Sequence, residues 1–376
     1  MKVLHLFSNA KWTGPAEPAL NLCVTLRRHG VETDFACAPD ARASINKVVE
    51  TARDRGIEPL LDMHLSKHRH LLKNAHDKRV LTRRLKTGGY DLIHCHLDND
   101  HTIALGTASK RGIPIVRSSY EGEGFPVSSR HRALLRATAG LVEPSQRALE
   151  HDARAFAFPI DRMRVVPNAV DVTRFDPARE LPDGRRWLGI PNDAFVVGIV
   201  ARMQTHRHYE DFFQVLRRLA DAHPHLHAIV VGRGTKQDQV AYRPVKSLSL
   251  EKAVHFPGFV DGENYVGVLK AFDVKVFLVP GSDGTCRAVR EAMAMGKPAV
   301  VADRGMLSEI VEHGQTGLVC DGSADGLFDA LNALAGDRAY TRKLGRAARE
   351  KAFLDYSLDA QAVSVKRFYE ALLATR

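Results

Sequence analysis

The sequence predicts an α/β protein made of two doubly wound, Rossmann-like domains that face a crevice. Short apolar runs alternate with amphipathic stretches along all 376 residues, which is typical of parallel sheets covered by helices on both faces. The pattern restarts at residue 194, after a stretch rich in Pro, Asp and Gly. A chain of this length also suits two cores better than one.

The first half alternates predicted strands with predicted helices that end near glycine. Gly30 and Gly56 each follow a helical pattern and precede an apolar run, as expected of αβ units. The predicted strands are 2–8, 31–37, 57–63, 91–96 and 113–119, and the predicted helices are 18–29, 43–55, 67–86 and 102–110.

The second half repeats this organisation. Its predicted strands are 194–203, 227–234, 253–260, 273–280, 298–303 and 316–320, and a final helix covers 358–375. The predicted domains are 1–170 and 194–356, joined by a linker at 171–193 and followed by a C-terminal stretch, 357–376, that we expect to pack back across the hinge. Ligands of such folds bind beyond the carboxyl ends of the strands.

Composition narrows the class of protein. The formal net charge is +10 and the pI is near 9.4, which favours anionic partners or serves solubility alone. Five cysteines without a C-x-x-C pair indicate a reducing compartment, without disulfides or a zinc site. The start predicts a first strand rather than a secretory leader, and no apolar run is long enough to cross a bilayer. We therefore expect a cytoplasmic protein.

Residues 281–303, "GSDGTCRAVREAMAMGKPAVVAD", predict a glycine turn, a helix and a strand. Thr285 is a candidate helix cap, and the free N–H groups of 284–287 would point beyond the sheet toward phosphate or sugar oxygens. Asp283 and Glu291 would lie on a similar face, where carboxylates hold ligand hydroxyls. By itself this spacing favours a capped surface helix with solvated charges, because two acids eight positions apart are a weak signal.

Two arginines are expected at the same edge of the second sheet. Arg202 leaves the end of a predicted strand, and Arg207 precedes the next helix. Guanidinium groups suit a diphosphate both by charge and by their forked geometry. The alternative is a pair of exposed loop arginines.

The first half holds three further candidates. Gly14 lies in the first strand-to-helix turn, where backbone would approach a ligand, although a plain turn explains it equally well. The stretch "HCHLDNDH" at 94–101 is conceivable as a metal site, but His96, Asp98 and Asn99 indicate a polar strand end with a helix N-cap, which we favour. Tyr120 and Glu121 follow the next strand and would face the crevice.

The stretch 64–86 is strongly basic with interspersed leucines. It predicts either a helix that contacts an anionic membrane or an ordinary outer helix of the sheet. The interleaved aromatic residues of a nucleic-acid platform are absent, so we expect no nucleic-acid partner.

The chain resembles glycosyltransferase family 4, whose members have the two-domain GT-B fold. The resemblance runs through "TGPAEPALNL", "VVPNAVDVTRFDP", "IVARMQTHRHYEDFFQVL" and the segment from "VHFPGFVDGENYVGVL" to "TGLVCDGSADGLFDAL", in the family's order and spacing. It covers nearly the whole chain.

This resemblance implies a retaining transfer from a nucleotide-diphosphate sugar, UDP- or GDP-linked, without an essential metal or cofactor. It implies that Arg202 and Arg207 neutralise the leaving diphosphate and that Glu291 holds the ribose. It also implies sugar contacts at Asp283 and at the backbone of three residues, and base contacts from the segment Gly258, Phe259 and Val260. The three backbone positions are Gly284, Thr285 and Cys286.

Four positions depart from the family pattern. Pro15 follows Gly14 where the family has a second Gly, and Ala169 follows Asn168 where the family usually has Gly. Asp283 stands where the family usually has Glu, and Tyr120 stands where many members have His. His96, Tyr120 and Glu121 are expected on the acceptor side, where the acceptor is a sugar or a lipid-linked sugar. The expected role is synthesis of cell-surface polysaccharide, lipopolysaccharide or glycolipid at the inner face of the membrane. The alternatives are a phosphorylase or sugar-phosphate transferase of the same fold, and a non-catalytic basic binding protein.

Overall fold

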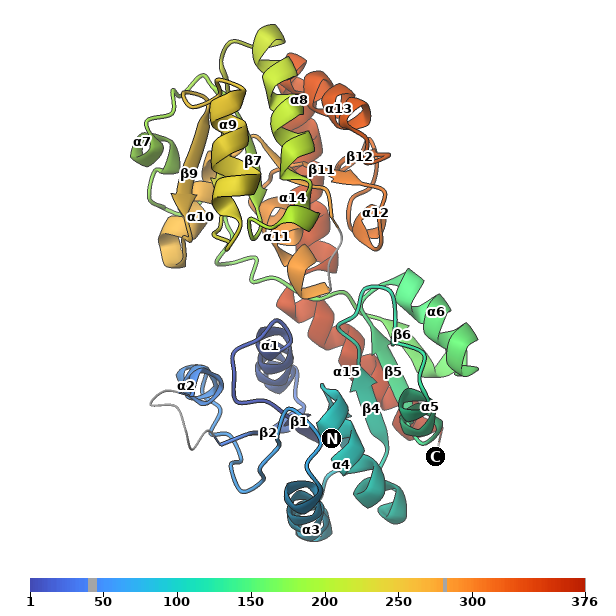
Figure 1. Cartoon of the computed structure of the whole chain (residues 1–376). Helices are drawn as coiled ribbons and strands as arrows, with labels where there is room; N and C mark the ends of the chain where they lie inside the picture. The colour runs from blue at the N-terminus through green and yellow to red at the C-terminus, as the bar shows by residue number, and fades with distance from the viewer. Residues whose placement is uncertain (40–45, 280–282, 376) are drawn as a thin grey trace. The chain divides into compact units, whose positions relative to one another are not determined.

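The computed structural model describes residues 1–39, 46–279 and 283–375, apart from the side chains of 283–285 (Figure 1). The chain divides into two compact units. The first contains Met1–Ala169 and Leu358–Arg376, and the second contains Val170–Gly281 and Thr285–Ser357. Both units are α/β, and all five cysteines are free and buried.

The first unit is a six-stranded parallel sheet in the order β2-β1-β3-β4-β5-β6. Its strands are β1 (Lys2–Phe7), β2 (Glu32–Cys37), β3 (Leu92–Cys95), β4 (Ile115–Ser118), β5 (Gly140–Glu143) and β6 (Met163–Val165). Its helices are α1 (Ala16–Arg28), α2 (Lys47–Asp54), α3 (Leu71–Thr87), α4 (Asp98–Ala108), α5 (Ser129–Arg136), α6 (Gln146–Phe156) and α15 (Leu358–Ala374), with short turns η1 (Ser109–Arg111) and η2 (Ile160–Arg162).

Helices cover both faces of this sheet, because successive strand residues point to opposite sides. Val3 packs with the side chains of α1 and α15, whereas Leu4 packs with those of α3 and α4. The predicted strand at 57–63 is wrong, since only Leu60 forms an isolated bridge there, to Ala36.

The second unit is also a six-stranded parallel sheet, in the order β12-β11-β10-β7-β8-β9. Its strands are β7 (Phe195–Val200), β8 (Leu226–Val231), β9 (Val254–Gly258), β10 (Val274–Phe277), β11 (Ala299–Ala302) and β12 (Gly317–Cys320). Its helices are α7 (Gly184–Leu188), α8 (Tyr209–Ala222), α9 (Arg243–Ser247), α10 (Gly262–Ala271), α11 (Asp283–Ala294), α12 (Leu307–Ile310), α13 (Ala324–Gly336) and α14 (Arg338–Asp355), with turns η3 (Thr205–Arg207) and η4 (Asp238–Tyr242).

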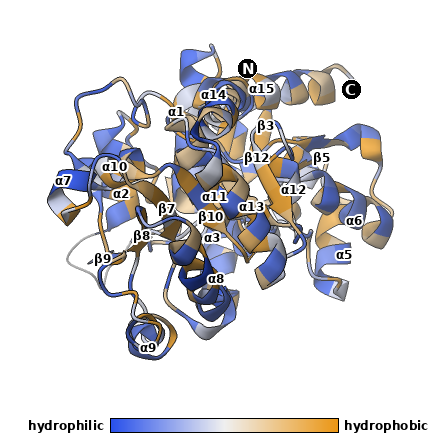
Figure 2. Ribbon diagram, turned by 90° about the horizontal axis from the view of Figure 1, so that it is seen from above, coloured by the Kyte–Doolittle hydropathy of each residue, from blue (hydrophilic) through white to orange (hydrophobic). Residues whose placement is uncertain are grey.

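The core of this unit also lies on both sides of its sheet. One cluster joins the strands to α8 and α13, and another joins them to α10, α11 and α14. The strands consist mostly of apolar residues, whereas the helices mix apolar and polar residues along their length (Figure 2).

Residues 171–193 do not form the separate linker that their composition suggests. Phe175 and Ile190 are buried in the core of the second unit, and α7 packs against α10. The contact is close, because a Cβ atom on Gly184 would lie 2.7 Å from the Gly267 carbonyl oxygen. Proline, aspartate and glycine here shape a packed surface segment rather than a flexible one.

The chain leaves the second unit at Ser357 and returns to the first as α15. The Val170 N–H donates to the Tyr356 carbonyl oxygen at 2.8 Å, just before this exit. Phe368 and Tyr369 of α15 are then buried in the core of the first unit.

Candidate functional site

The loops after β7, β8 and β9 are bound to one another through their backbones. The Met203 N–H donates to the Arg233 carbonyl oxygen at 3.3 Å, and the Gly232 N–H donates to the Gly258 carbonyl oxygen at 2.8 Å. A Cβ atom on Gly232 or Gly234 would collide with the backbone carbonyl of Ala201 or Met203. Glycine is therefore required for these loops to approach so closely.

Arg202 and Arg207 extend from this edge of the second unit. Arg202 lies two residues beyond β7 and is exposed. Arg207 ends η3 and is half-buried. Its Nε atom is buried and has no hydrogen-bond partner among the described residues. A buried donor without a partner is costly unless a ligand or water meets it.

The segment Gly258–Val260 follows β9. Gly258 has φ +76, a conformation that favours glycine. Phe259 is 66% exposed, whereas Val260 packs against the core. A large exposed aromatic ring at a strand end is available for stacking against a planar ligand.

Glu291 lies on α11 and is only 5% exposed. Its Oε2 accepts a hydrogen bond from the Tyr265 hydroxyl at 2.5 Å, and its Oε1 lies 3.2 Å from Arg287 Nε. Burial, and then the negative charge of Glu291, raise the pKa of Tyr265 well above its ordinary value. The phenol therefore stays protonated and fixes the carboxylate.

Other predicted residues of this stretch are placed differently. The helix begins at Asp283, two residues before the predicted start at Thr285. The side chains of Asp283 and Thr285 lie outside the described residues, and Gly284 is described only as part of α11. The Cys286 side chain is fully buried in the core.

The first unit contains a cavity of about 450 Å³ that His96, Tyr120 and Glu121 line together. Thr13 and Pro15 also line it, on either side of Gly14. A Cβ atom on Gly14 would meet no atom within 4 Å, so packing does not explain this glycine. The structure thus brings the three predicted acceptor-side residues to one cavity.

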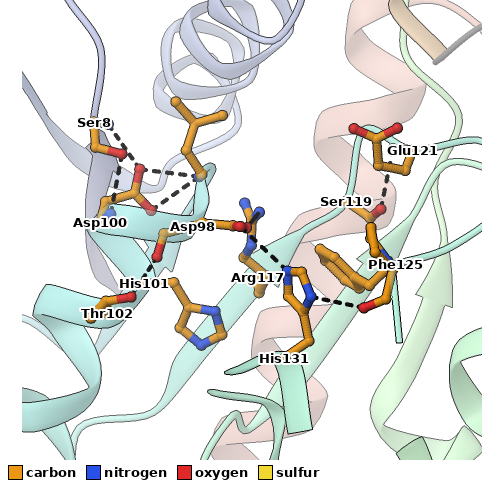
Figure 3. Close-up of polar contacts among 12 residues, drawn as sticks. Ser8, Asp98, Asp100, His101, Thr102, Arg117, Ser119, Glu121, Phe125 and His131 are labelled. Atoms are coloured by element: carbon orange, nitrogen blue, oxygen red, sulfur yellow. Dashed lines mark hydrogen bonds and ion pairs between the residues drawn. The ribbon is translucent and has the colours of Figure 1, made fainter. Parts of the chain in front are cut away.

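Asp98 is the centre of an ion cluster in the wall of this cavity (Figure 3). Arg117 Nη2 lies 3.1 Å from its carboxylate, His131 Nε2 lies at 3.3 Å and Arg130 Nη1 at 3.9 Å. The hydrogen bond from His131, aided by the charge of Arg117, holds the pKa of the Asp98 carboxyl well below its usual range. Asp98 therefore stays ionised.

Sequence reasoning did not identify Arg117, Arg130 or His131. One signal was available, because Arg117 lies inside an apolar strand, and a charged residue there needs a partner. Its side chain is buried and lies over the Phe125 ring, with 5.3 Å from Cζ to the ring centroid.

His96, just beyond β3, belongs to a buried imidazole cluster with His5 of β1 and His94 of β3. The rings of His94 and His96 stack with centroids 4.4 Å apart, which confirms that both lie on one face. His5 Nδ1 lies 3.0 Å from His96 Nε2, and His96 Nδ1 lies 2.7 Å from the Tyr120 hydroxyl. His94 contacts the Ser118 and Tyr369 hydroxyls.

Burial gives these imidazoles low proton affinity. It lowers the pKa of His5 to about 3 and those of His94 and His96 well below 6.5. Nitrogen atoms of the three rings lie within 4.8 Å of one another, a spacing compatible with a metal ion. Most of these nitrogen atoms already face hydroxyl groups or each other. A hydrogen-bonded core cluster therefore explains them.

The predicted polar strand end at His96 needs correction. His96 is fully buried, and α4 begins at Asp98 with Leu97 as its N-cap. Asp100 accepts from the backbone N–H groups of Leu97 and Ser8, at 3.0 and 2.8 Å. Asp98 and Asn99 are thus helical residues rather than caps.

The basic stretch 64–86 is divided between a loop and α3. The helix begins at Leu71, four residues after its predicted start. Leu81 and Leu85 are buried against the sheet, but Leu71 and Leu72 are 72% and 80% exposed. Lys67, His68 and Arg69 precede the helix and line the 450 Å³ cavity. Among the described residues, no helix is long and apolar enough to span a bilayer.

Two family models match consecutive parts of the chain. The model described as Glycosyltransferase Family 4 matches residues 14–174, and that described as Glycosyl transferases group 1 matches residues 183–351.

Curated relatives match at moderate identity. A D-inositol 3-phosphate glycosyltransferase of Corynebacterium jeikeium is 31% identical over 220 residues, which is 56% of this chain and about half, 52%, of the relative. An enzyme of that name from Corynebacterium efficiens is 28% identical over 92% of this chain and 87% of its own. A glycogen synthase of Mycobacterium tuberculosis is 27% identical over 63% of this chain and 55% of its own.

Solved structures share the fold. The HepE protein of Anabaena, solved with UDP, has a TM-score of 0.79 at 20% identity and covers 99% of this chain and 100% of its own. A glycosyltransferase of Rickettsia africae has a TM-score of 0.80 at 14% identity, covering 100% and 99%. A UDP-GlcNAc 2-epimerase of Neisseria meningitidis has 0.69 at 16%, covering 99% and 100%. The last likeness shows that the fold alone does not determine the reaction.

Proposed function

Because the chain belongs to glycosyltransferase family 4, with two Rossmann-like units of the GT-B class, we propose that it moves a sugar from a nucleotide-diphosphate sugar to an acceptor hydroxyl with retention. One observation carries the proposal. Strands β7 and β10 are hydrogen-bonded parallel neighbours, so the loop bearing Arg202 and Arg207 and the helix bearing Glu291 follow adjacent strand ends.

In this proposal Arg202 and Arg207 stabilise the charge that develops on the departing diphosphate. Preorganised cations at a developing charge are often the largest catalytic term. The buried, unpartnered Nε of Arg207 is a donor suited to a phosphate oxygen. A metal ion is then not needed to stabilise the negative charge of the leaving diphosphate. The mechanism also uses no side-chain nucleophile.

Other residues at the same edge of the second sheet make the remaining contacts with the sugar donor. Glu291, oriented by Tyr265, accepts hydrogen bonds from the ribose hydroxyls. Gly258, Phe259 and Val260 meet the base. The backbone of Gly284, Thr285 and Cys286, together with Asp283, meets the sugar. UDP and GDP are both candidates, and the neighbouring HepE protein was solved with UDP.

The acceptor binds in the first unit, in the cavity lined by His96, Tyr120 and Glu121. The proposed product belongs to cell-surface polysaccharide, lipopolysaccharide or glycolipid, made in the cytoplasm at the inner face of the membrane. A phosphorylase or sugar-phosphate transferase would not need Glu291 for a ribose. A non-catalytic binding protein would not need a fixed carboxylate there.

The test is donor turnover with a panel of UDP- and GDP-sugars in the presence of EDTA. We expect Arg202→Ala and Arg207→Ala each to lower kcat/KM by about tenfold to a hundredfold, because each removes a charge-assisted hydrogen bond worth about 1.5–3 kcal/mol. Arg186→Ala is the matched control, since Arg186 is an exposed arginine of α7. Full turnover in the double variant would refute the phosphate assignment, and a strict need for a divalent ion would refute the metal-free mechanism.

A further inference from the structure

Two chemically different sets of side chains line the cavity of the first unit. Asn9, Tyr120 and Glu121 offer an amide, a phenol and a carboxylate, which suit hydroxyl groups. Lys67 and Arg69 of the same lining offer positive charge, and His68 offers an imidazole. The volume of about 450 Å³ is in the range of small-molecule sites.

The backbone before the basic segment 67–69 is held in place, although the side chains of the segment are exposed. The Asp77 carboxylate accepts from the backbone N–H groups of His64 at 2.7 Å and Leu65 at 3.0 Å. Asn99 Nδ2 donates to the Ser66 carbonyl oxygen at 2.7 Å. These bonds fix the backbone that leads into 67–69, so Lys67 and Arg69 are presented at the cavity by an ordered segment.

The positive charge of the lining is only partly compensated. Lys67, His68 and Arg69 form no hydrogen bond or ion pair with any described residue. Arg117 and Arg130 share the single carboxylate of Asp98. Four fixed cations (Lys67, Arg69, Arg117 and Arg130) therefore meet two carboxylates (Asp98 and Glu121) around one cavity.

Arg117 supplies a second, independent observation. Its side chain is 6% exposed, and its Nη1 atom is buried without a hydrogen-bond partner in the described part of the chain. Arg117 also lines the cavity, so its incompletely paired guanidinium group would be stabilised by an anionic oxygen bound there.

We propose that this cavity binds the phosphate group of a phosphorylated acceptor, while Asn9, Tyr120 and Glu121 hold the acceptor's hydroxyl groups. The inference rests on the proposed transferase function and names the chemical class of its acceptor: a phosphomonoester or phosphodiester of a sugar or polyol. The same phosphate chemistry occurs in a free sugar phosphate and in a phospholipid headgroup.

The test uses the full chain and reads Lys67 directly. Lysine acetylation rates are measured by mass spectrometry in potassium phosphate and in potassium chloride of equal ionic strength, with UDP present to occupy the donor site. We expect phosphate to slow acetylation of Lys67 and to leave Lys110 unchanged, because Lys110 is an exposed lysine of the same unit outside the cavity. Equal effects on both lysines would overturn the proposal.

Two arginine variants test whether the protection of Lys67 by phosphate depends on the cavity. In Arg69→Gln, about tenfold more phosphate should be needed to protect Lys67 to the same degree, since one charge-assisted hydrogen bond is lost. Arg111→Gln, which removes an exposed arginine beside Lys110, should not change it. Thermal unfolding of both variants confirms that they fold. Equal behaviour of the two would also overturn the proposal.

Two further probes distinguish the sources of phosphate. Glucose 6-phosphate represents a free sugar phosphate, and monomeric dihexanoylphosphatidylglycerol represents a lipid headgroup. Stronger protection by either one, compared with inorganic phosphate, supports an acceptor of that source. Protection by neither beyond inorganic phosphate would reduce the site to a general anion site and overturn the inference.

Donor turnover separates this inference from the proposed function. Turnover of a nucleotide sugar with no protection of Lys67 would leave the transferase function in place and refute the phosphate subsite. Protection of Lys67 without turnover of any donor would support the subsite and refute the transferase function.

Discussion

Glu291 is the residue whose environment most restricts its role. Its carboxylate is nearly buried, yet both oxygens are held, one by Tyr265 and one by Arg287. A carboxylate fixed in this way loses little conformational freedom when it binds a diol, because the ordering has already occurred on folding.

We therefore predict that Glu291→Ala weakens binding of the nucleoside diphosphate itself by roughly tenfold or more, since two hydrogen bonds to a charged group are lost. Tyr265→Phe should weaken it less, because Arg287 still holds the carboxylate. Calorimetric titration with UDP and GDP measures both effects. An unchanged Kd in Glu291→Ala would exclude the ribose contact.

The sequence pattern placed Glu291 on a helix after a strand, and the family resemblance implied its role, but neither predicted Tyr265. The two residues are 26 positions apart, and their contact depends on how α10 and α11 pack on one face of the sheet. The same limit applies to Asp98, whose partner His131 lies on a helix that the apolar pattern did not reveal. Side-chain pairs across elements require the tertiary arrangement, which periodicity alone does not determine.

At the scale of elements, β1 and β3 bring three neutral imidazoles into the core of the first unit. Their pKa values are lowered in the folded state by burial, whereas an unfolded histidine titrates near 6.5. Below pH 6.5 the unfolded chain binds protons that the folded chain does not. The contribution of these imidazoles to the free energy of unfolding is therefore fully present above pH 6.5. It is lost as the pH falls from 6.5 toward their pKa values in the folded state.

We predict that each such imidazole costs the first unit about 2 kcal/mol of unfolding free energy between pH 7 and pH 5. The chain has two tryptophans, so a Trp187→Phe background leaves Trp12 of the first unit as the fluorescent probe of urea unfolding. His5→Gln should flatten the pH dependence relative to that background. Buried Asp100, whose pKa is raised to about 7, acts in the opposite sense, so only this difference is diagnostic. Identical slopes would contradict the prediction.

Helix α3 has an exposed face that carries both leucines and basic residues. Leu71 and Leu72 are exposed beside Lys73, and Arg79, Arg83 and Lys86 are exposed further along the helix. Leu81 and Leu85 pack on the sheet, so the ordinary outer-helix interpretation holds for one face and leaves the other available.

We predict salt-reversible binding of the protein to vesicles that contain anionic lipid, and none to neutral vesicles. Basic residues near such a surface contribute about 1 kcal/mol each, screened beyond a Debye length. Changing Lys73, Arg79, Arg83 and Lys86 to Glu should abolish co-sedimentation at low salt. Lys110→Glu with Arg111→Glu is the control for charge at another exposed site. Wild-type protein that stays in the supernatant at low salt would refute the membrane contact.

The apolar runs predicted most strands of both sheets, because a buried parallel strand is apolar on both faces. Three outcomes differ from the prediction. The run 57–63 is not a strand, since it contains Pro59 and lies beside β2 through one bridge only, and strands β5 and β6 were not predicted. Helix starts were less predictable. At the start of α4 the Asp100 carboxylate accepts hydrogen bonds from the backbone N–H groups of Leu97 and the distant Ser8. The loop before α3 is held by Asp77 of α3 and by Asn99 of α4.

At the scale of the whole molecule, the first unit is discontinuous in sequence. Its sheet is complete by residue 165, yet Ala362, Val365, Phe368 and Tyr369 of α15 fill part of its core. Tyr369 also contacts His94 of the buried imidazole cluster. The first unit is therefore completed only when the last helix is present, after the entire second unit.

Removing α15, in a chain that ends at Ser357, should destabilise the first unit and leave the second intact. Three large side chains, Val365, Phe368 and Tyr369, are at most 2% exposed. At about 1.5–3 kcal/mol each, their loss removes roughly 5–9 kcal/mol, a large part of the 5–15 kcal/mol that stabilises an ordinary domain.

In the Trp187→Phe background, the urea transition of Trp12 should shift to much lower urea or vanish. In a Trp12→Phe background, the transition of Trp187 in the second unit should stay unchanged. Equal stability of the first unit with and without α15 would show that this helix is an accessory to its core rather than a part of it.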